Sequence, residues 1–190
     1  MRSPRLRMVA GGLVIGAGPR SVSVQLVPAD QPLGRVDAVV LEEDTHLVLS
    51  APVAVPNEPE HPVRVMTALI EAQPARPGNV IVKGRSGPLR FLAVVHDVEQ
   101  TPTWREEWVR AAVEAVVIEA TRRRLRTLAV PVLAAKHGSM SPLAFARVLR
   151  ETLLGGPASS LETLYLLLPP LDVIERRNVE RELLGVNTIC

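Results

Sequence analysis

The stretch TLAVPVLAAKHGSMSPLAFARVLRETLL, residues 127–154, joins an apolar run to a helical pattern through a short polar turn. Residues 127–135 are apolar almost without a break, which is typical of a strand buried on both faces of a parallel sheet. Residues 141–154 are expected to form a helix, with Ser141 as its N-cap and Pro142 at its first position. A buried strand that leads directly into a helix predicts an α/β fold.

The same alternation extends in both directions from this stretch. The apolar run VDAVVL (36–41) predicts a second buried strand, and the spacing of Val63, Met66, Leu69 and Ile70 predicts a helix over 62–73. Further strands are expected at 79–84, 90–98 and 162–168, further helices at 102–125 and 171–184, and an N-terminal hairpin at 7–15 and 21–27. This order predicts a mostly parallel, twisted sheet sandwiched by helices.

The helix over 102–125 is the longest that the sequence predicts, with Thr101 or Thr103 as its expected N-cap. The side chains predicted to share its apolar face are Trp104, Trp108, Ala111, Ala112, Ala115 and Val116. Arginines at 122–124 and 126 crowd its C-terminal end, where they complement the helix dipole. We therefore interpret these arginines as a solvated helix end rather than a nucleic-acid patch.

Composition fits one domain over residues 1–190, with a hairpin at 7–27, a core at 29–184 and a short tail at 185–190. Because 47% of the residues are hydrophobic, a disordered chain is excluded. The single cysteine, Cys190, excludes a disulfide framework. The 22 basic and 20 acidic residues nearly cancel, so we do not expect nucleic acid as a partner. No apolar run is long enough to span a membrane, and we expect a cytoplasmic protein.

Acidic side chains follow the predicted strand at 36–41. Glu42, Glu43, Asp44 and His46 lie within five residues of one another, a density that suggests a metal site or general acid/base chemistry. The alternative is an acidic rim, because neighbouring carboxylates are common on loops. Elsewhere, His96 ends an apolar strand, where a histidine more often satisfies a backbone partner than binds a metal.

The turn after the strand at 127–135 carries different chemistry. Lys136, His137, Gly138, Ser139 and Ser141 directly precede a helix N-terminus, so backbone amides, a lysine and two hydroxyls gather there. Such a set is suited to an anion or a phosphate. The alternative is an ordinary strand-to-helix turn with good capping.

Four segments, taken in order, give the chain a resemblance to the macro domain, a module that binds ADP-ribose. ADQPLGRVDAVV (29–40) is similar to the opening segment of that family, and GNVIVKGRSGPLRFLAVVHDV (78–98) to its strand, turn and histidine-bearing strand. TLAVPVLAAKHGSMSP (127–142) resembles its strand and phosphate loop, and ETLYLLLPP its final strand. The resemblance covers residues 22–184.

The resemblance implies a three-layer α/β/α sandwich around a six-stranded mixed sheet, with a ligand cleft at the strand ends. Asp30 would accept a hydrogen bond from an adenine amino group, and the 136–141 loop would wrap a diphosphate and the distal ribose. The candidate ligand-binding residues are therefore Asp30, Asp44, Lys136, His137, Gly138, Ser139, Met140 and Ser141. No cofactor, no bound metal and no catalytic residue is assigned.

Two departures from the family pattern affect function. Residues 41–44, Leu-Glu-Glu-Asp, replace an asparagine-bearing segment, and residues 50–53, Ser-Ala-Pro-Val, replace a glycine-rich loop. Proline has no amide hydrogen to donate, and carboxylates repel phosphates. Both changes therefore imply weaker binding of a diphosphate.

Three functions follow. The first is a module that binds ADP-ribose or a related nucleotide without clear catalysis. The second is a macro-fold scaffold for protein interaction or a homodimer, with no nucleotide binding. The third, which has less support, is a metal-assisted hydrolase that uses Glu42, Glu43, Asp44 and His46.

Overall fold

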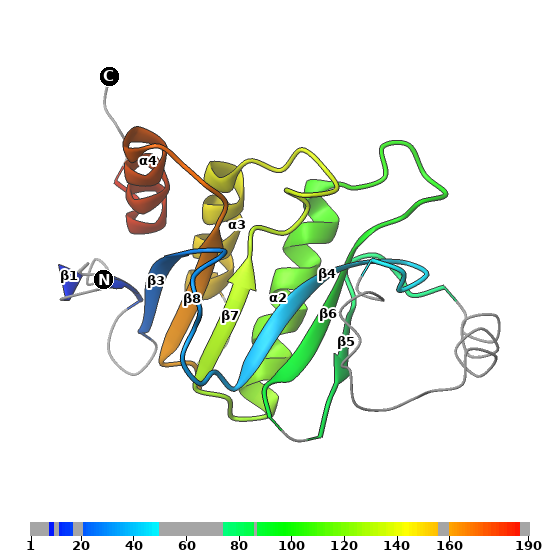
Figure 1. The fold of residues 1–190 in the computed structure, drawn as a ribbon, viewed down its shortest axis with the longest axis horizontal. Helices are drawn as coiled ribbons and strands as arrows, with labels where there is room; N and C mark the ends of the chain where they lie inside the picture. Colours follow the sequence, from blue (N-terminus) through cyan, green and yellow to red (C-terminus); the bar gives the residue numbers. More distant parts are fainter. Residues whose placement is uncertain are drawn as a thin grey trace.

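The computed structural model describes residues 8–9, 12–16, 21–49, 74–85, 87–155 and 160–186 (Figure 1). The predicted helix at 62–73, the segment at 50–53 and the end of the C-terminal tail lie outside the described residues.

Within those ranges the strands form one eight-stranded sheet with the order β1-β2-β3-β8-β7-β4-β6-β5. Their bounds are β1 Met8–Val9, β2 Gly12–Ile15, β3 Val22–Pro28, β4 Ala38–Asp44, β5 Val80–Lys83, β6 Leu89–His96, β7 Thr127–Pro131 and β8 Thr163–Leu168. The neighbours from β3 to β6 pair in parallel, whereas β1–β2, β2–β3 and β5–β6 pair antiparallel. The predicted mixed α/β fold is therefore confirmed.

The sheet is larger than the expected six strands because the N-terminal ribbon joins its edge. The six strands from β3 to β5 form the expected core, and β2 pairs antiparallel with β3 in the register Leu13↔Val24. The predicted hairpin between 7–15 and 21–27 is therefore present, with its first arm divided into β1 and β2. Leu13, Ile15, Val22 and Val24 alternate into the core, which joins the ribbon to the rest of the domain.

The described helices are α2 (Glu106–Arg122), α3 (Pro142–Gly155) and α4 (Val173–Leu184). Figure 1 shows α2 and α3 side by side along one face of the sheet, with α4 beyond α3 near the ribbon. Ser141 caps α3, since its Oγ accepts a hydrogen bond from the amide of Ala144 at 3.1 Å, as expected. Asp172 caps α4 in a complete capping box with Glu175.

The start of α2 differs from the prediction. The helix begins after Arg105, which provides no side-chain cap, rather than after Thr101 or Thr103. Thr103 is already engaged, because its carbonyl accepts a hydrogen bond from the amide of Asp97 at 2.8 Å. Trp104 then forms an isolated antiparallel bridge with His96, so these residues extend along β6 instead of entering the helix.

The buried face of α2 also differs from the predicted one. Its buried side chains are Val109, Ala112, Val113, Val116, Val117 and Ala120, whereas Ala111 is exposed. The predicted apolar face was positioned so that it included both tryptophans. In the structure, Trp104 lies outside the helix and Trp108 is only half-buried. At the C-terminal end, Arg122 and Arg123 form ion pairs with Glu119.

Two central strands diverge near their carboxyl ends. β4 pairs with β7 only at Ala38↔Leu128 and Val39↔Ala129, although β4 continues to Asp44. Pro131, two residues beyond Ala129, has no amide hydrogen with which the pairing could continue. The backbones of β4 and β7 therefore separate beyond Val39 and Ala129, and the candidate site lies where they separate.

Within the described ranges, no helix combines the length and the apolar composition needed to cross a bilayer.

Candidate functional site

A cleft of about 680 Å³ opens at the carboxyl ends of the parallel strands. This volume lies in the range of small-molecule sites, roughly 300–1,000 Å³. In α/β sheets, ligands bind at this edge, because loops from several strands meet there. The residues that line the cleft are Ala29, Leu41, Glu42, Leu49, Pro131, Val132, Ala135, Lys136, His137, Met140, Pro142, Leu167, Pro169, Pro170 and Leu171.

Glu42 forms one wall of the cleft and connects three elements. Its Oε1 lies 2.6 Å from Nε2 of His96, and its Oε2 accepts a hydrogen bond from the amide of Ala134 at 2.9 Å. The side chain is 11% exposed and that of His96 is 3% exposed. Because both oxygens have partners, this carboxylate ties β4 to the end of β6 and to the loop after β7.

The loop after β7 turns sharply at Ala134, which has a φ of 56°. The carbonyl of Ala134 accepts a hydrogen bond from the amide of Met140 at 3.1 Å, which closes the loop. Gly138 packs against its base, where an added Cβ would lie 2.5 Å from that carbonyl oxygen and 2.8 Å from Cδ1 of Trp104. The loop therefore requires glycine at this position because there is no space for a side chain.

The charged end of the cleft carries two basic side chains. Lys136 and His137 are exposed on the loop and line the cleft. The ring of His137 meets that of His96 edge-on, with centroids 6.1 Å apart. The loop leads into α3 through Ser141, so backbone amides at a helix N-terminus lie beside these two side chains.

The other end of the cleft is apolar. Leu167 and the segment at 169–171 contribute the end of β8 and the loop after it. Met140 is buried, and Ala29 follows β3. The cleft therefore has one charged end and one end suited to a flat apolar group.

The acidic residues expected on a loop lie instead on β4. Glu42, Glu43 and Asp44 are its last three residues. Oε2 of Glu43 accepts hydrogen bonds from the amides of Asp44 and Leu49, and Oδ1 of Asp44 accepts one from the amide of His46 at 2.6 Å. The sequence pattern misplaced these residues because the apolar run ends at Leu41, although strand pairing with β6 continues to Asp44.

No group of three His, Cys, Asp or Glu side chains in the described part of the chain is arranged to hold a metal ion. Nε2 of His46 lies 3.5 Å from Oε1 of Glu99, a residue beyond the end of β6. The three β4 carboxylates serve separate partners, so the metal-assisted hydrolase finds no support here.

The sequence-predicted binding residues fall into three groups. Lys136, His137 and Met140 line the cleft. Gly138, Ser139 and Ser141 shape the same loop, with Ser139 exposed and Ser141 engaged as a cap. Asp30 is exposed beside the cleft residue Ala29, whereas Asp44 is buried and holds the turn at His46.

Sequence reasoning missed several parts of the site. The segment at 169–171 follows a strand end, and its two prolines were the available signal for a rigid wall. The ring of Trp104 packs behind Gly138, whereas the sequence pattern predicted this tryptophan on a helix face. Glu42 was predicted as part of a metal or general acid/base site or of an acidic rim, and no local pattern predicts its pairing with His96, 54 residues away.

Comparison with known proteins defines the fold. No protein-family model matches the sequence, and no curated protein matches it in sequence. Solved structures do match. An Oceanobacillus iheyensis macrodomain mutant aligns with a TM-score of 0.66 at 12% identity, covering 97% of this chain and 96% of that one. The chain therefore has a macrodomain fold, as the sequence resemblance implied.

Some of these similar structures contain nucleotides. A second mutant of the Oceanobacillus iheyensis macrodomain, solved with ADPR, aligns with a TM-score of 0.63 at 11% identity over 92% of this chain and 97% of that one. A Trypanosoma brucei macrodomain in complex with ADP aligns with a TM-score of 0.59 at 14% identity over 83% and 68%. At such identities the likeness establishes the fold and leaves the function open.

Proposed function

We propose that this protein is a macrodomain-like module that binds ADP-ribose or a related phosphorylated nucleotide in the cleft at the strand ends. The observation that carries the proposal is the 680 Å³ cleft with Lys136 and His137 at one end and the apolar segment at 169–171 at the other. A nucleotide has the same two parts, since its phosphates are anionic and its base is flat and largely apolar.

The charged end suits a phosphate. Lys136 supplies a full positive charge, and the amides that begin α3 add the partial charge of a helix N-terminus. Glu42 would oppose an anion, but both of its oxygens already accept hydrogen bonds, from His96 and from Ala134. These hydrogen bonds partly compensate the negative charge of Glu42 and therefore reduce its repulsion of an anion.

The apolar end suits a base. Leu167 and the prolines at 169 and 170 offer flat apolar contact, and Asp30 follows directly on Ala29 at this side. A carboxylate there would accept a hydrogen bond from the amino group of adenine. Replacing Asp30 with alanine should therefore reduce discrimination between ADP-ribose and its inosine analogue, which lacks that amino group.

Isothermal titration calorimetry with ADP-ribose tests the proposal, and the two lysines of the chain provide a matched pair of variants. Lys136 lines the cleft, whereas Lys83 is exposed at the end of β5, on the far edge of the sheet. We expect Lys136→Ala to weaken binding about tenfold, because one charge-assisted hydrogen bond is lost. Lys83→Ala should bind as the unmodified protein does.

Two results would overturn this proposal. A folded sample that gives no heat with millimolar ADP-ribose lacks the site. Equal losses for Lys136→Ala and Lys83→Ala would indicate general attraction of an anion rather than a site. ADP and ribose 5-phosphate, titrated separately, identify which end of the cleft provides the affinity.

A second candidate function, a scaffold that forms homodimers, is favoured by one observation. At the start of α4, Val173 is 68% exposed and Ile174 is 69% exposed, and they are adjacent in the sequence. Large apolar side chains that lie together at the surface favour a protein interface. Light scattering after size-exclusion chromatography should then show a dimer that Ile174→Glu dissociates, and a monomer at high concentration contradicts this function.

A further inference from the structure

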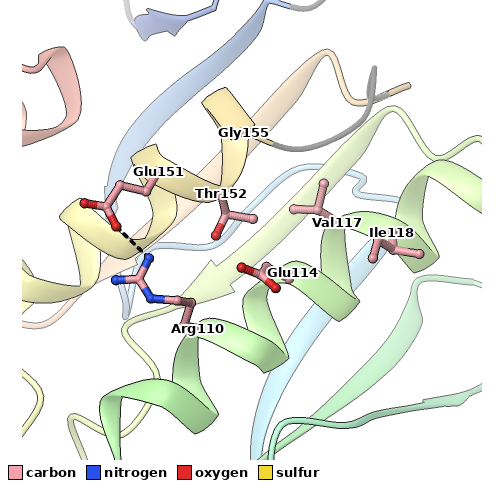
Figure 2. Close-up of a pocket in the computed structure, with 7 residues that line it drawn as sticks. All are labelled: Arg110, Glu114, Val117, Ile118, Glu151, Thr152 and Gly155. Atoms are coloured by element: carbon pink, nitrogen blue, oxygen red, sulfur yellow. Dashed lines mark hydrogen bonds and ion pairs between the residues drawn. The ribbon is translucent and has the colours of Figure 1, made fainter.

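A cavity of about 360 Å³ between α2 and α3 contains charged side chains but is not suited to a phosphate. Figure 2 shows Arg110 from α2 directed toward Glu151 from α3, and these two residues form an ion pair. Arg110 also lies 3.3 Å from Glu106, and Glu114 adds a further carboxylate to the lining. Because these carboxylates outnumber the guanidinium, a phosphate would be repelled there. The donors that suit a phosphate lie instead at the charged end of the strand-end cleft.

The loop after β7 carries consecutive backbone amides that have no partner. Within the described residues, the amides of residues 136–139 donate no hydrogen bond. The amides nearby are engaged, since that of Ala134 donates to Glu42 and that of Met140 donates to the carbonyl of Ala134. Successive main-chain amides that are free to donate form a concavity that binds anions. This loop therefore offers main-chain donors in addition to the side chains of Lys136 and His137.

The ring of Trp104 presents its polar edge to the same loop. Its Cδ1 and Nε1 lie 2.8 and 2.9 Å from the position that a Cβ on residue 138 would occupy. The tryptophan reaches this place because it pairs with His96 in an antiparallel bridge at the end of β6. A side chain at position 138 would push the ring away, so Gly138 keeps the indole N–H close to the main chain of the loop.

The indole N–H of Trp104 has no acceptor in the described part of the chain. Trp104 is half-buried, and the polar side-chain atoms that are buried there without a hydrogen bond belong to Thr45, Arg150 and Thr152. Nε1 of Trp104 is therefore open to solvent and to a ligand. A partly buried tryptophan usually finds a partner for its N–H, so a free one beside free amides indicates an acceptor on a ligand.

We propose that the indole N–H of Trp104 donates a hydrogen bond to a phosphate of the ligand, beside the amides of residues 136–139. This inference rests on the proposed function, because it assigns a further ligand-contacting residue to the same site. An indole N–H donates and cannot accept, so it favours an oxygen that carries no hydrogen. A phosphate oxygen is such an acceptor, and its charge strengthens the hydrogen bond.

The direct test is NMR of the indole N–H signals of the isotope-labelled full chain during titration with ADP-ribose. The chain has two tryptophans, so Trp108→Phe identifies the Trp104 signal by removing the other. We expect the Trp104 signal to move downfield with ADP-ribose and to stay in place with adenosine, which has the base without the phosphates. The Trp108 signal is the matched control and should not move, because Trp108 lies outside the cleft lining, with the guanidinium of Arg105 5.0 Å from its ring.

Calorimetry on two conservative variants measures the size of the effect. Trp104→Phe keeps a ring against Gly138 and removes the N–H, so ADP-ribose should bind about tenfold more weakly. Its affinity for adenosine should be unchanged, whereas a general distortion of the cleft would weaken both ligands. Trp108→Phe should bind ADP-ribose as the unmodified protein does.

The outcomes separate this inference from the proposed function. If ADP-ribose binds while the Trp104 signal stays in place, or if Trp104→Phe binds it equally well, the inference is wrong and the proposed function stands. An equal shift with adenosine, or equal weakening of both ligands in Trp104→Phe, would also overturn the inference, because the contact would not be with a phosphate. No binding of ADP-ribose to the folded protein would overturn the proposed function, and this inference with it.

Discussion

Replacement of Glu42 provides the sharpest test of how the cleft is built. In Glu42→Leu, the ring nitrogen of His96 and the amide of Ala134 both lose their acceptor in a nearly closed environment. Removing one partner of a buried, hydrogen-bonded charge costs about 3–5 kcal/mol. We therefore expect the free energy of unfolding to fall by about that amount.

Glu42→Gln should be milder, for a reason specific to this geometry. The glutamine oxygen can still accept from Ala134, and its amide group can donate to His96 if the imidazole shifts its hydrogen to the other nitrogen. Both contacts then survive without charge assistance, at a cost of about 1–2 kcal/mol.

Urea unfolding of the two Glu42 variants measures this difference. Glu99→Gln is the control, since Glu99 is exposed and lies 3.5 Å from His46, and such pairs contribute about 0–1 kcal/mol. In Glu42→Leu, hydrogen exchange at the amide of Ala134 should also speed up. A loss below about 1 kcal/mol in Glu42→Leu would refute the view that this carboxylate holds the loop.

Two further predictions concern acid stability and the loop. The hydrogen bond from Arg122 lowers the pKa of Glu119 to about 2 from 4.5, so this carboxylate stabilises the fold above about pH 4.5 and loses that effect as the pH falls toward 2. Glu119→Gln should therefore show a smaller drop in its urea midpoint between about pH 6 and about pH 3 than the unmodified protein. Gly138→Ala should destabilise the fold by about 1–3 kcal/mol, because its Cβ meets a backbone oxygen and the Trp104 ring, and should weaken ADP-ribose binding.

Each of these two predictions would be contradicted by a specific result. An equal loss of stability at acid pH in Glu119→Gln and the unmodified protein would show that Glu119 does not set that dependence. For the glycine, Gly34→Ala is the control, since no described atom beyond its own residue and its two chain neighbours lies within 4 Å of the position that its Cβ would occupy. Equal stability of the two alanine variants would contradict the close packing of the loop.

The strand and helix over 127–154 could be predicted because each step depends on local chemistry. The apolar run, the serine cap and the proline at the first helical position all act within a few residues of one another. The end of the strand could not be predicted to better than a few residues. β7 stops at Pro131, and the equally apolar residues 132–134 are buried in a turn that Glu42 holds from another strand.

The same limit applies to the site. Lys136 and His137, which line the cleft, could be proposed from the sequence because they lie in the polar turn between a predicted strand and a predicted helix. The start of α2 depends on the bridge between Trp104 and His96 of β6, and the partner of Glu42 lies on β6, 54 residues away. The 136–141 loop could be predicted from the residue types that it contains. The position of Glu42, in the wall opposite that loop, is fixed instead by the pairing of β4 with β6.

The divergence of β4 from β7 has a consequence for how this protein can change. The opening arises where the main-chain pairing of β4 with β7 ends, at Val39↔Ala129. Substitutions at half-buried lining positions such as Leu41 or Ala135 can therefore alter the shape and polarity of the cleft without closing the space. Evolution, or a protein engineer, can therefore replace residues that line the cleft while the domain stays folded.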